Sequence, residues 1–368
     1  MSRNPSLILR FDRVDGHHAA RQDPPRSHPI GGTDLSVSAP LDPPTLDEIR
    51  SCRERLGDRV KTTPMWHWCG PGIDERRGTM QLHLKLELFQ FGGSFKPRGA
   101  LSVMQEMSPA ALARGVAAIS AGNHAIATAY AAKGLRSHAT VVMPRTANRA
   151  RVEACRRLGA TVQLTDDIAQ AFVDVEGLCA REGRTFVHPF EGLLTARGTG
   201  TLGLEILSQL AEVEAVVVPI GGGGLCAGVA AAVKQAAPHV HVFGVEPVGA
   251  DTMHRSFASG SPQSIASVRT IADSLGAPHA APYSMALCQR FVDELVLIDD
   301  DMIRDAMRTL FVNARLAVEP AGAAATAAVL GPLRDRLQGK RVVSIVCGSN
   351  MDPETFQVYL AGSGPTTD

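Results

Sequence analysis

Short apolar runs alternate with helix-like stretches along most of the chain. Every second residue from Leu82 to Leu88 is leucine, which predicts a strand over 82–88 with these side chains on one face. Thr45 and Glu48 have the spacing of a capping box, and the apolar residues of 46–56 then follow a helical period. An alanine-rich helix is predicted at 123–133. Further short apolar strands are predicted at 116–119, 139–143, 161–164, 186–188, 216–220, 242–245 and 342–346.

This alternation predicts an α/β fold with parallel sheets that are covered by helices on both faces. The chain has 368 residues, which favours more than one domain, and its 45% of apolar residues can build a large core. Residues 1–42 differ, because they contain several prolines and a mixture of Arg and Asp without a sustained period. We expect them to form a mobile N-terminal extension without a signal peptide, since Arg10 interrupts the apolar stretch 6–11.

Composition and charge exclude several classes of partner. Lys+Arg and Asp+Glu both number 37, and aromatic residues make up only 5%, so no nucleic-acid partner is expected. The longest uncharged stretch, 215–233, contains Pro219 and four consecutive glycines, which argues against a membrane span. The seven cysteines are scattered without a CxxC pair, which is typical of reduced thiols in a cytoplasmic protein and does not indicate a zinc site.

The segment FGGSFKPRGA contains the first candidate for chemistry, Lys96. Lysine is scarce in this chain, and Lys96 follows a glycine pair and stands between Phe95 and Pro97. A lysine in apolar surroundings can have a lowered pKa and form a Schiff base. Taken alone, the segment is better explained by a solvated lysine in a loop.

Two predicted strand-to-helix junctions could bind anions. The segment SAGNH, Ser120 to His124, opens a helix whose free amides suit a carboxylate or phosphate, although an ordinary turn capped by Ser120 or Asn123 explains it equally well. The four glycines Gly221–Gly224 lie between a strand and a helix. They lack the Lys and Ser/Thr of a nucleotide-binding P-loop, but four glycines favour a phosphate site over a simple turn.

Further polar or reactive residues stand at the ends of predicted elements. Cys347 directly follows an apolar strand, where side chains face the ligand crevice of a parallel sheet, but it could equally be a buried structural thiol. Glu246 and Glu319 each precede a proline. They could carry protons or bind a ligand, or they could simply be the acids of helix starts.

In their order along the chain, these segments resemble the serine/threonine dehydratases (threonine ammonia-lyases), which are fold-type II pyridoxal-phosphate (PLP) enzymes. The resemblance implies a two-domain α/β fold like that of the tryptophan synthase β subunit. It implies a large domain made of 43–105 and 196–368, a small domain made of 106–195, an active site in the cleft between them, and a homodimer. The matching segments, from roughly Pro44 to Asp352, are SFKPRGA, SAGNHA, FVHPFEG, GTGTLGLEI, PIGGGGLCAG, TIADSL, VEPAGAA and VCGSN.

The resemblance also assigns roles to single residues. Lys96 would hold the cofactor covalently and remove the α-proton of the substrate, and Phe95 would pack near the cofactor ring. Asn123 would donate to the phenolic oxygen of the cofactor, Gly221–Gly224 would bind its phosphate, and Cys347 would lie near its pyridine nitrogen. An uncharged partner there makes the ring a milder electron sink, which suits β-elimination. The substrate would contact Ser94, Ser120, Ala121, Gly122, Asn123, His124 and Ser274.

The implied reaction is β-elimination from a small β-hydroxy amino acid, such as L-threonine or L-serine, to a 2-keto acid and ammonia. Racemisation is disfavoured, because the related racemases carry a serine at the position of Ala121. A β-replacement enzyme of the same fold, or a PLP-binding sensor without catalysis, would also fit many of these residues.

Some positions depart from the family pattern. Family members that bind a cation near the cofactor have acidic residues around the position of Glu246, but Thr252 stands where a second acid often occurs, so a cation is in doubt and no metal ligands are assigned. Ser274 replaces a common glycine, and Thr199 stands where many relatives have Gln. Both changes could mark a substrate other than serine or threonine.

Overall fold

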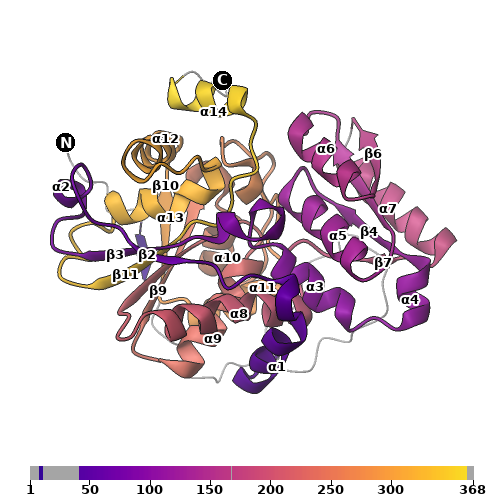
Figure 1. Ribbon diagram of the computed structural model, residues 1–368, viewed down its shortest axis with the longest axis horizontal. Helices are drawn as coiled ribbons and strands as arrows, with labels where there is room; N and C mark the ends of the chain where they lie inside the picture. The colour runs from indigo at the N-terminus through magenta and orange to yellow at the C-terminus, as the bar shows by residue number, and fades with distance from the viewer. Residues whose placement is uncertain (1–7, 11–40, 167, 363–368) are drawn as a thin grey trace.

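The computed structural model describes residues 8–10, 41–166 and 168–362, which form two β-sheets with helices around them (Figure 1). The larger sheet has seven strands in the order β1-β10-β9-β8-β11-β3-β2. The edge strands β1 and β2 are antiparallel to their neighbours, and the inner strands are parallel. Its strands are β1 Ile8–Arg10, β2 Met65–His67, β3 Gln81–Lys85, β8 Ala215–Pro219, β9 His241–Pro247, β10 Glu294–Ile298 and β11 Arg341–Ile345.

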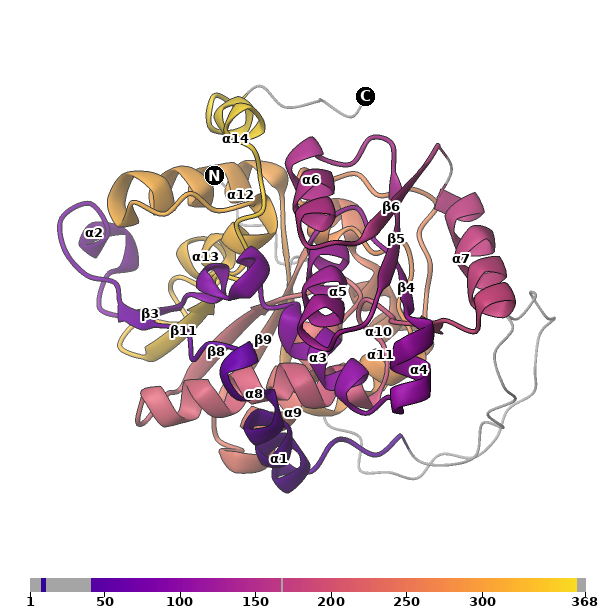
Figure 2. The same cartoon turned by 45° about the vertical axis from the view of Figure 1, so that its right-hand side comes forward.

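The smaller sheet has four parallel strands in the order β6-β5-β4-β7. Figure 2 shows it between α5 and α6 on one side and α7 on the other. The sheet lies within the segment 106–195, although the domain boundaries at these two residues stay predictions. Its strands are β4 Val116–Ile119, β5 Ala139–Pro144, β6 Thr161–Thr165 and β7 Thr185–Phe186.

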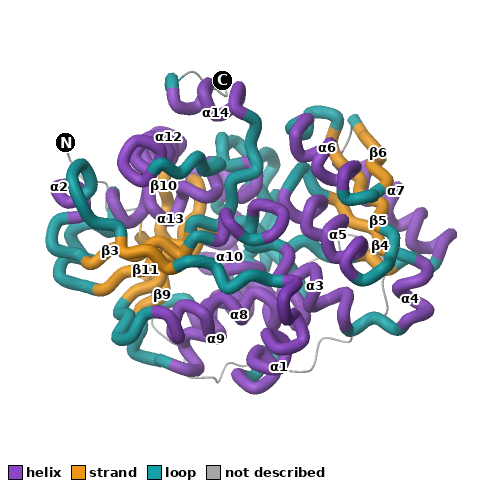
Figure 3. Tube along the Cα trace, viewed as in Figure 1, coloured by secondary structure: helices purple, strands orange, loops and turns teal. Residues whose placement is uncertain are grey.

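Helices cover both faces of the larger sheet, with α12 and α13 on one side and α8 and α9 on the other (Figures 1 and 3). Within the described residues, no helix is long and apolar enough to cross a membrane. The helices are α1 Leu46–Leu56, α2 Asp74–Arg77, α3 Pro97–Gln105, α4 Pro109–Arg114, α5 Asn123–Gly134, α6 Arg149–Arg157, α7 Ile168–Glu182, α8 Leu193–Gln209, α9 Gly224–Ala236, α10 Thr252–Ser259, α11 Pro282–Phe291, α12 Asp300–Thr309, α13 Pro320–Leu330 and α14 Pro353–Leu360.

Small side chains let the central helices approach the sheet and each other closely. Every residue of α13 is buried, and all but one of its side chains from Pro320 to Thr326 are proline, glycine or alanine. A Cβ atom on Gly228 of α9 would overlap Thr199 and the backbone of α8, so only glycine allows the two helices to pack there. This packing fixes where α9 begins, and with it the position of the glycine loop.

The fold confirms the predicted alternation and corrects some of its details. Thr45 and Glu48 form the predicted capping box. The strand predicted over 82–88 ends at Lys85, because the backbone turns where the buried Glu87 pairs with Arg98. The strands β2 and β10 were not predicted. Within the stretch predicted to be mobile, Ile8–Arg10 instead forms a strand paired with β10. The prediction for 1–7 and 11–40 lies outside the described residues.

Candidate active site

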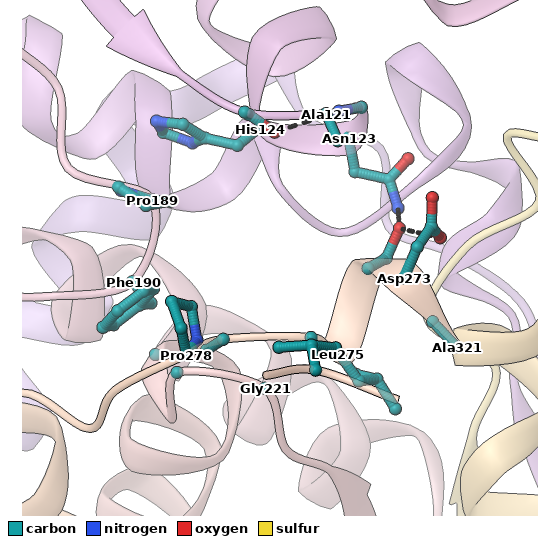
Figure 4. A pocket seen from close by; sticks show the side chains of 18 of the residues that line it. Ala121, Asn123, His124, Pro189, Phe190, Gly221, Asp273, Leu275, Pro278 and Ala321 are labelled. Carbon is teal, nitrogen blue, oxygen red and sulfur yellow. Dashed lines mark hydrogen bonds between the residues drawn. The ribbon is translucent and has the colours of Figure 1, made fainter. Parts of the chain in front are cut away.

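One cavity of about 710 Å³ lies between the two sheets, and most of the predicted site residues line it (Figure 4). The strands β4, β8 and β11 end at this cavity, as expected for the carboxyl edge of parallel sheets. A loop from Ala266 to His279 forms a further wall. The predicted residues in the lining are Phe95, Lys96, Ser120, Ala121, Gly122, Asn123, His124, Gly221, Gly222, Gly223, Gly224, Ser274 and Cys347.

Lys96 lies at the start of α3, directly before Pro97. Its Nζ donates a hydrogen bond of 2.7 Å to the carbonyl oxygen of Pro189 and lies 5.1 Å from the ring centre of Phe95. Burial lowers the pKa of Lys96 to about 8, because a charged ammonium loses its hydration in these surroundings. A substantial fraction of this amine is therefore neutral near physiological pH, as a nucleophile or a base requires.

The glycine loop Gly221–Gly224 presents unpaired amides to the cavity. Among the described residues, the amides of Gly222 to Leu225 have no protein acceptor, and they stand at the start of α9. Cβ atoms on Gly222 or Gly224 would overlap the ring or the backbone of Phe190, and Gly223 has a φ of +96°. The glycines are thus required by close packing as well as by the turn. The result is a rigid group of donors at a positive helix end, which suits a phosphate.

The segment from His188 to Glu191 connects Lys96 with the glycine loop. His188 Nδ1 accepts the amides of Phe190 and Glu191, and burial lowers the pKa of His188 to about 4, so that this nitrogen is free to accept. The same segment supplies the Pro189 carbonyl that binds Lys96. The sequence motif FVHPFEG matched the family but gave no hint of this supporting role.

The start of α5 forms a second group of free amides. Ser120 Oγ accepts the amide of Gly122, whereas the amides of Ala121, Asn123 and His124 have no acceptor within the part of the chain that the structure describes. His124 Nε2 donates to the carbonyl oxygen of Val187 at 2.7 Å, and burial lowers the pKa of His124 to about 3. His124 is therefore a neutral ring that supports the loop, and the amides remain available for a carboxylate.

Polar side chains from four separate segments meet behind Asn123. Asn123 Nδ2 donates to Glu319 Oε1 at 2.6 Å, and Arg151 Nη2 donates to Glu319 Oε2 at 3.1 Å. Arg151 also pairs with Asp273, and Asn350 donates to Asn123 Oδ1 at 2.7 Å. Burial raises the pKa of Glu319 to about 7, although the charge of Arg151 opposes this shift. Arg151 was not among the predicted residues.

Cys347 follows β11 and lines the cavity near Lys96 and Glu319. Its Sγ donates to the carbonyl oxygen of Ala321 at 3.3 Å. Burial raises the pKa of Cys347 well above its usual range, so the thiol stays neutral. A neutral thiol is the kind of uncharged group that the resemblance places near a pyridine nitrogen.

Two of the residues singled out in the sequence lie outside the lining of this cavity. Ser94, predicted to bind substrate, is fully buried, because its backbone bridges to Gly348 within the wall. Thr199 donates through its hydroxyl to the carbonyl oxygen of Gly224 at 2.7 Å, and thus supports the glycine loop. Ser274, in contrast, does line the cavity, with its Oγ 3.4 Å from Asn123 Nδ2.

Comparisons with known proteins place this site in a family. The family model described as "Pyridoxal-phosphate dependent enzyme" matches residues 58–348, and the chain belongs to this family. The chain is 50% identical over 317 residues to the "Phenylserine dehydratase" of Ralstonia pickettii, covering 86% of this chain and 96% of the relative. It is 37% identical over 309 residues to the "L-threonine ammonia-lyase" of Thermotoga maritima, covering 84% and 76%.

Solved structures agree with this assignment. Maize serine racemase has a TM-score of 0.80 with 33% identity, covering 86% of this chain and 97% of the racemase. Threonine deaminase isoform 2 from Solanum lycopersicum has a TM-score of 0.81 with 33% identity, covering 87% and 88%. The predicted family, the fold class and the class of PLP-dependent ammonia-lyase are confirmed, and with them β-elimination from hydroxy amino acids as the class of reaction.

The residues of the cavity fit pyridoxal phosphate. The cofactor needs an amine for its aldehyde, donors for its phosphate and a partner for its pyridine nitrogen, which the resemblance expects to be uncharged. The cavity contains one lysine with a lowered pKa, a set of unpaired glycine amides and a neutral buried thiol, at Lys96, Gly221–Gly224 and Cys347.

Proposed function

We propose that this chain deaminates a 3-hydroxy amino acid with an aryl group on its β-carbon, such as 3-phenylserine, by β-elimination of water followed by hydrolysis. One observation carries the proposal: the amine of Lys96 shares a single cavity with two separate sets of free helix-start amides. An amino acid and a phosphorylated cofactor together present two anions, and each set of amides suits one of them.

Each group has a proposed place. The amides of Gly222 to Leu225 would hold the cofactor phosphate, and Lys96 would hold the cofactor covalently. Asn123 would donate to its phenolic oxygen, and Cys347 would be the uncharged partner of its pyridine nitrogen. Phe95 packs near the ring. When bound, the cofactor supplies an electron sink that makes the α-proton of an amino acid removable.

The chain's own residues do the remaining work. The amides of Ala121, Asn123 and His124 bind the substrate carboxylate and orient the α-carbon. The amine of Lys96, when it is free, would accept the α-proton, which its lowered pKa allows near neutral pH. The wall 266–279 limits the access of water to the cavity. The β-hydroxyl would then leave as water with the proton that Lys96 has accepted, and hydrolysis, which takes up one water, would yield a 2-keto acid and ammonium. From 3-phenylserine the keto acid is phenylpyruvate.

The preference for an aryl substrate has two supports. The relative named for phenylserine is 50% identical, whereas the threonine ammonia-lyase of Thermotoga maritima is 37% identical. The cavity is about 710 Å³ and includes large apolar or aromatic side chains beyond those assigned to the cofactor. Such walls suit an aromatic ring better than the methyl group of threonine. They include Ile119, Phe172, Phe190, Val268 and Pro278.

The remaining predictions about partners form part of this proposal. No cation is proposed at Glu246, because its carboxylate accepts the amides of Met253 and His254 at 2.8 Å each at the positive end of α10. The homodimer follows from the family resemblance alone. A cytoplasmic location is supported by the seven free cysteines.

The decisive experiment is an assay of the purified protein with added pyridoxal phosphate. The substrates are L-threo-3-phenylserine, L-threonine, L-serine and D-serine, and both 2-keto acid and ammonia are measured. We expect the highest kcat/KM with phenylserine and no turnover by Lys96→Ala. Preference for threonine would overturn the substrate assignment. Cofactor binding without any 2-keto acid would overturn the proposed reaction and favour a sensor that binds the cofactor without catalysis.

A further inference from the structure

The hydrogen bonds around Asn123 form a chain whose direction is fixed at both ends. At one end, Asn350 Nδ2 donates to the carbonyl oxygen of Gly92 at 2.6 Å, and a carbonyl can only accept. At the other end, Arg151 donates to Glu319, and a guanidinium can only donate. Between these ends, Asn350 Nδ2 donates to Asn123 Oδ1, and Asn123 Nδ2 donates to Glu319 Oε1.

This series of hydrogen bonds determines how the side-chain amide of Asn123 is oriented. Because Asn350 presents its NH₂ group, Asn123 must place Oδ1 on that side. Because Glu319 presents an oxygen, Asn123 must place Nδ2 on the other side. The second hydrogen of Nδ2 then points toward Ser274 Oγ, 3.4 Å away on the cavity wall. Asn123 thus presents an N–H donor to the cavity, and its side-chain carbonyl oxygen faces away.

Burial and close packing hold the side chain of Glu319 in this position. Its side chain is fully buried and stands directly before Pro320 at the start of α13. A Cβ atom on Gly348 would overlap Glu319 Oε1, so the backbone beside Cys347 needs glycine to admit the carboxylate. Donors contact both of its oxygens, which favours the ionised form, whereas burial raises the pKa of Glu319 to about 7.

We infer that Glu319 is a positioning residue that fixes the amide of Asn123, so that its N–H faces the cofactor. The inference rests on the proposed function, which places the phenolic oxygen of the cofactor at Asn123. Glu319 itself does not line the cavity and therefore acts through Asn123. An N–H donor at that oxygen stabilises its ionised form, whereas a reversed amide would destabilise it.

Two substitutions disturb this series of hydrogen bonds from opposite ends. Glu319→Gln leaves only one acceptor oxygen for two donors, Asn123 and Arg151. Asn350→Asp presents an acceptor to Asn123 Oδ1 and favours the reversed amide. Glu294→Gln is the matched control, because Glu294 is also a buried carboxylate with an arginine partner, Arg336, but it lies on β10, outside the group of side chains that holds Asn123.

The main readout is the absorption spectrum of the bound cofactor against pH, since the band reports whether the phenolic oxygen is ionised. We expect both Glu319→Gln and Asn350→Asp to retain the cofactor, with affinity reduced less than about tenfold. In both, the midpoint of the spectral transition should rise by about one pH unit, because a stabilising hydrogen bond is lost. Glu294→Gln should keep the wild-type midpoint.

The outcomes separate this inference from the proposed function. An unchanged midpoint in both variants, with only lower thermal stability, would overturn the positioning role and leave Glu319 a structural residue. A wild-type protein that shows the cofactor band but no lyase activity would contradict the proposed reaction, and the spectral test of Glu319 would still be valid.

Discussion

The helix starts of α5 and α9 open into the same cavity, yet they are built differently. Both follow a parallel strand, and both present amides without a protein acceptor among the residues that the structure describes. The α9 start consists of glycines that are packed against Phe190. The α5 start carries the side chains of Ser120 and His124, which tie the loop to its own backbone and to the continuation of β7 at Val187.

This difference suits two different ligands. The glycine loop has no side chains that could move, and its amides form a fixed group of donors for a phosphate that stays bound. The α5 loop is half-exposed at Ser120 and Ala121 and offers both amides and side chains to the cavity. It suits a substrate carboxylate that enters and leaves in each turnover. We therefore assign the binding of the cofactor phosphate to the α9 start and the binding of the substrate carboxylate to the amides of the α5 start, and substitutions at each start can separate the two.

Gly224→Ala should have the largest effect. The added Cβ would overlap the backbone of Phe190, which a change of side-chain rotamer cannot relieve. We expect the loop to shift and the affinity for pyridoxal phosphate to fall by about 100-fold or more. Titration of the apoprotein with the cofactor, followed by absorbance, measures this change.

Gly134→Ala provides the control for this substitution. Gly134 ends α5, and a Cβ there would meet no atom within 4 Å. Cofactor affinity should be unchanged, and helix stability should rise slightly, by about 0.5–1 kcal/mol at most. If Gly224→Ala bound the cofactor as tightly as this control, the glycine loop would not be the phosphate site.

Gly122→Ala should have a smaller effect of a different kind. A Cβ on Gly122 would lie 2.6 Å from Arg151 Cδ, so the α5 loop or the arginine must move. Because the glycine loop is untouched, we expect cofactor affinity to change less than about threefold. The KM for the amino acid should rise by about tenfold, equivalent to one lost hydrogen bond of the carboxylate. Steady-state kinetics at saturating cofactor measures KM, and a tenfold loss of cofactor affinity would contradict the division between the two helix starts.

The sequence revealed both helix starts because each is a local motif. SAGNH and the four glycines are continuous segments after apolar strands, so their positions at the carboxyl edge of a sheet could be predicted. The group behind Asn123 has no such signature. Arg151, Asp273, Glu319 and Asn350 lie far apart in the chain and meet only when the two sheets pack together.

Tertiary structure also explains the two residues that lie outside the cavity lining. Ser94 stands one residue before Phe95 in the lysine motif, and only its bridge to Gly348 reveals that it is buried in the wall. Thr199 differs from the family pattern. Its hydroxyl donates to the carbonyl oxygen of Gly224, a contact that the sequence could not indicate. Local sequence thus identified the groups that line the cavity, and it did not reveal which residues hold them in place.

Ala121→Ser should have the smallest effect on elimination and tests a different property of the α5 loop. Ala121 lines the cavity and carries no proton donor, so we assign movement of the α-proton to Lys96 alone. A serine hydroxyl at this position would supply a second proton carrier, as the resemblance to serine racemases implies. We expect kcat for elimination to change less than about threefold. We also expect racemisation of serine to appear. Chiral chromatography should detect the opposite enantiomer in the serine that has not reacted.

Ala277→Ser serves as the control, because it places the same hydroxyl on the loop 266–279, another part of the cavity lining. It should leave the enantiomer of the substrate unchanged. Racemisation by both variants would indicate that position 121 has no special relation to the α-carbon. Racemisation by neither would show that a hydroxyl on the α5 loop does not reach the α-carbon, and the expectation that Ala121 disfavours racemisation would be wrong.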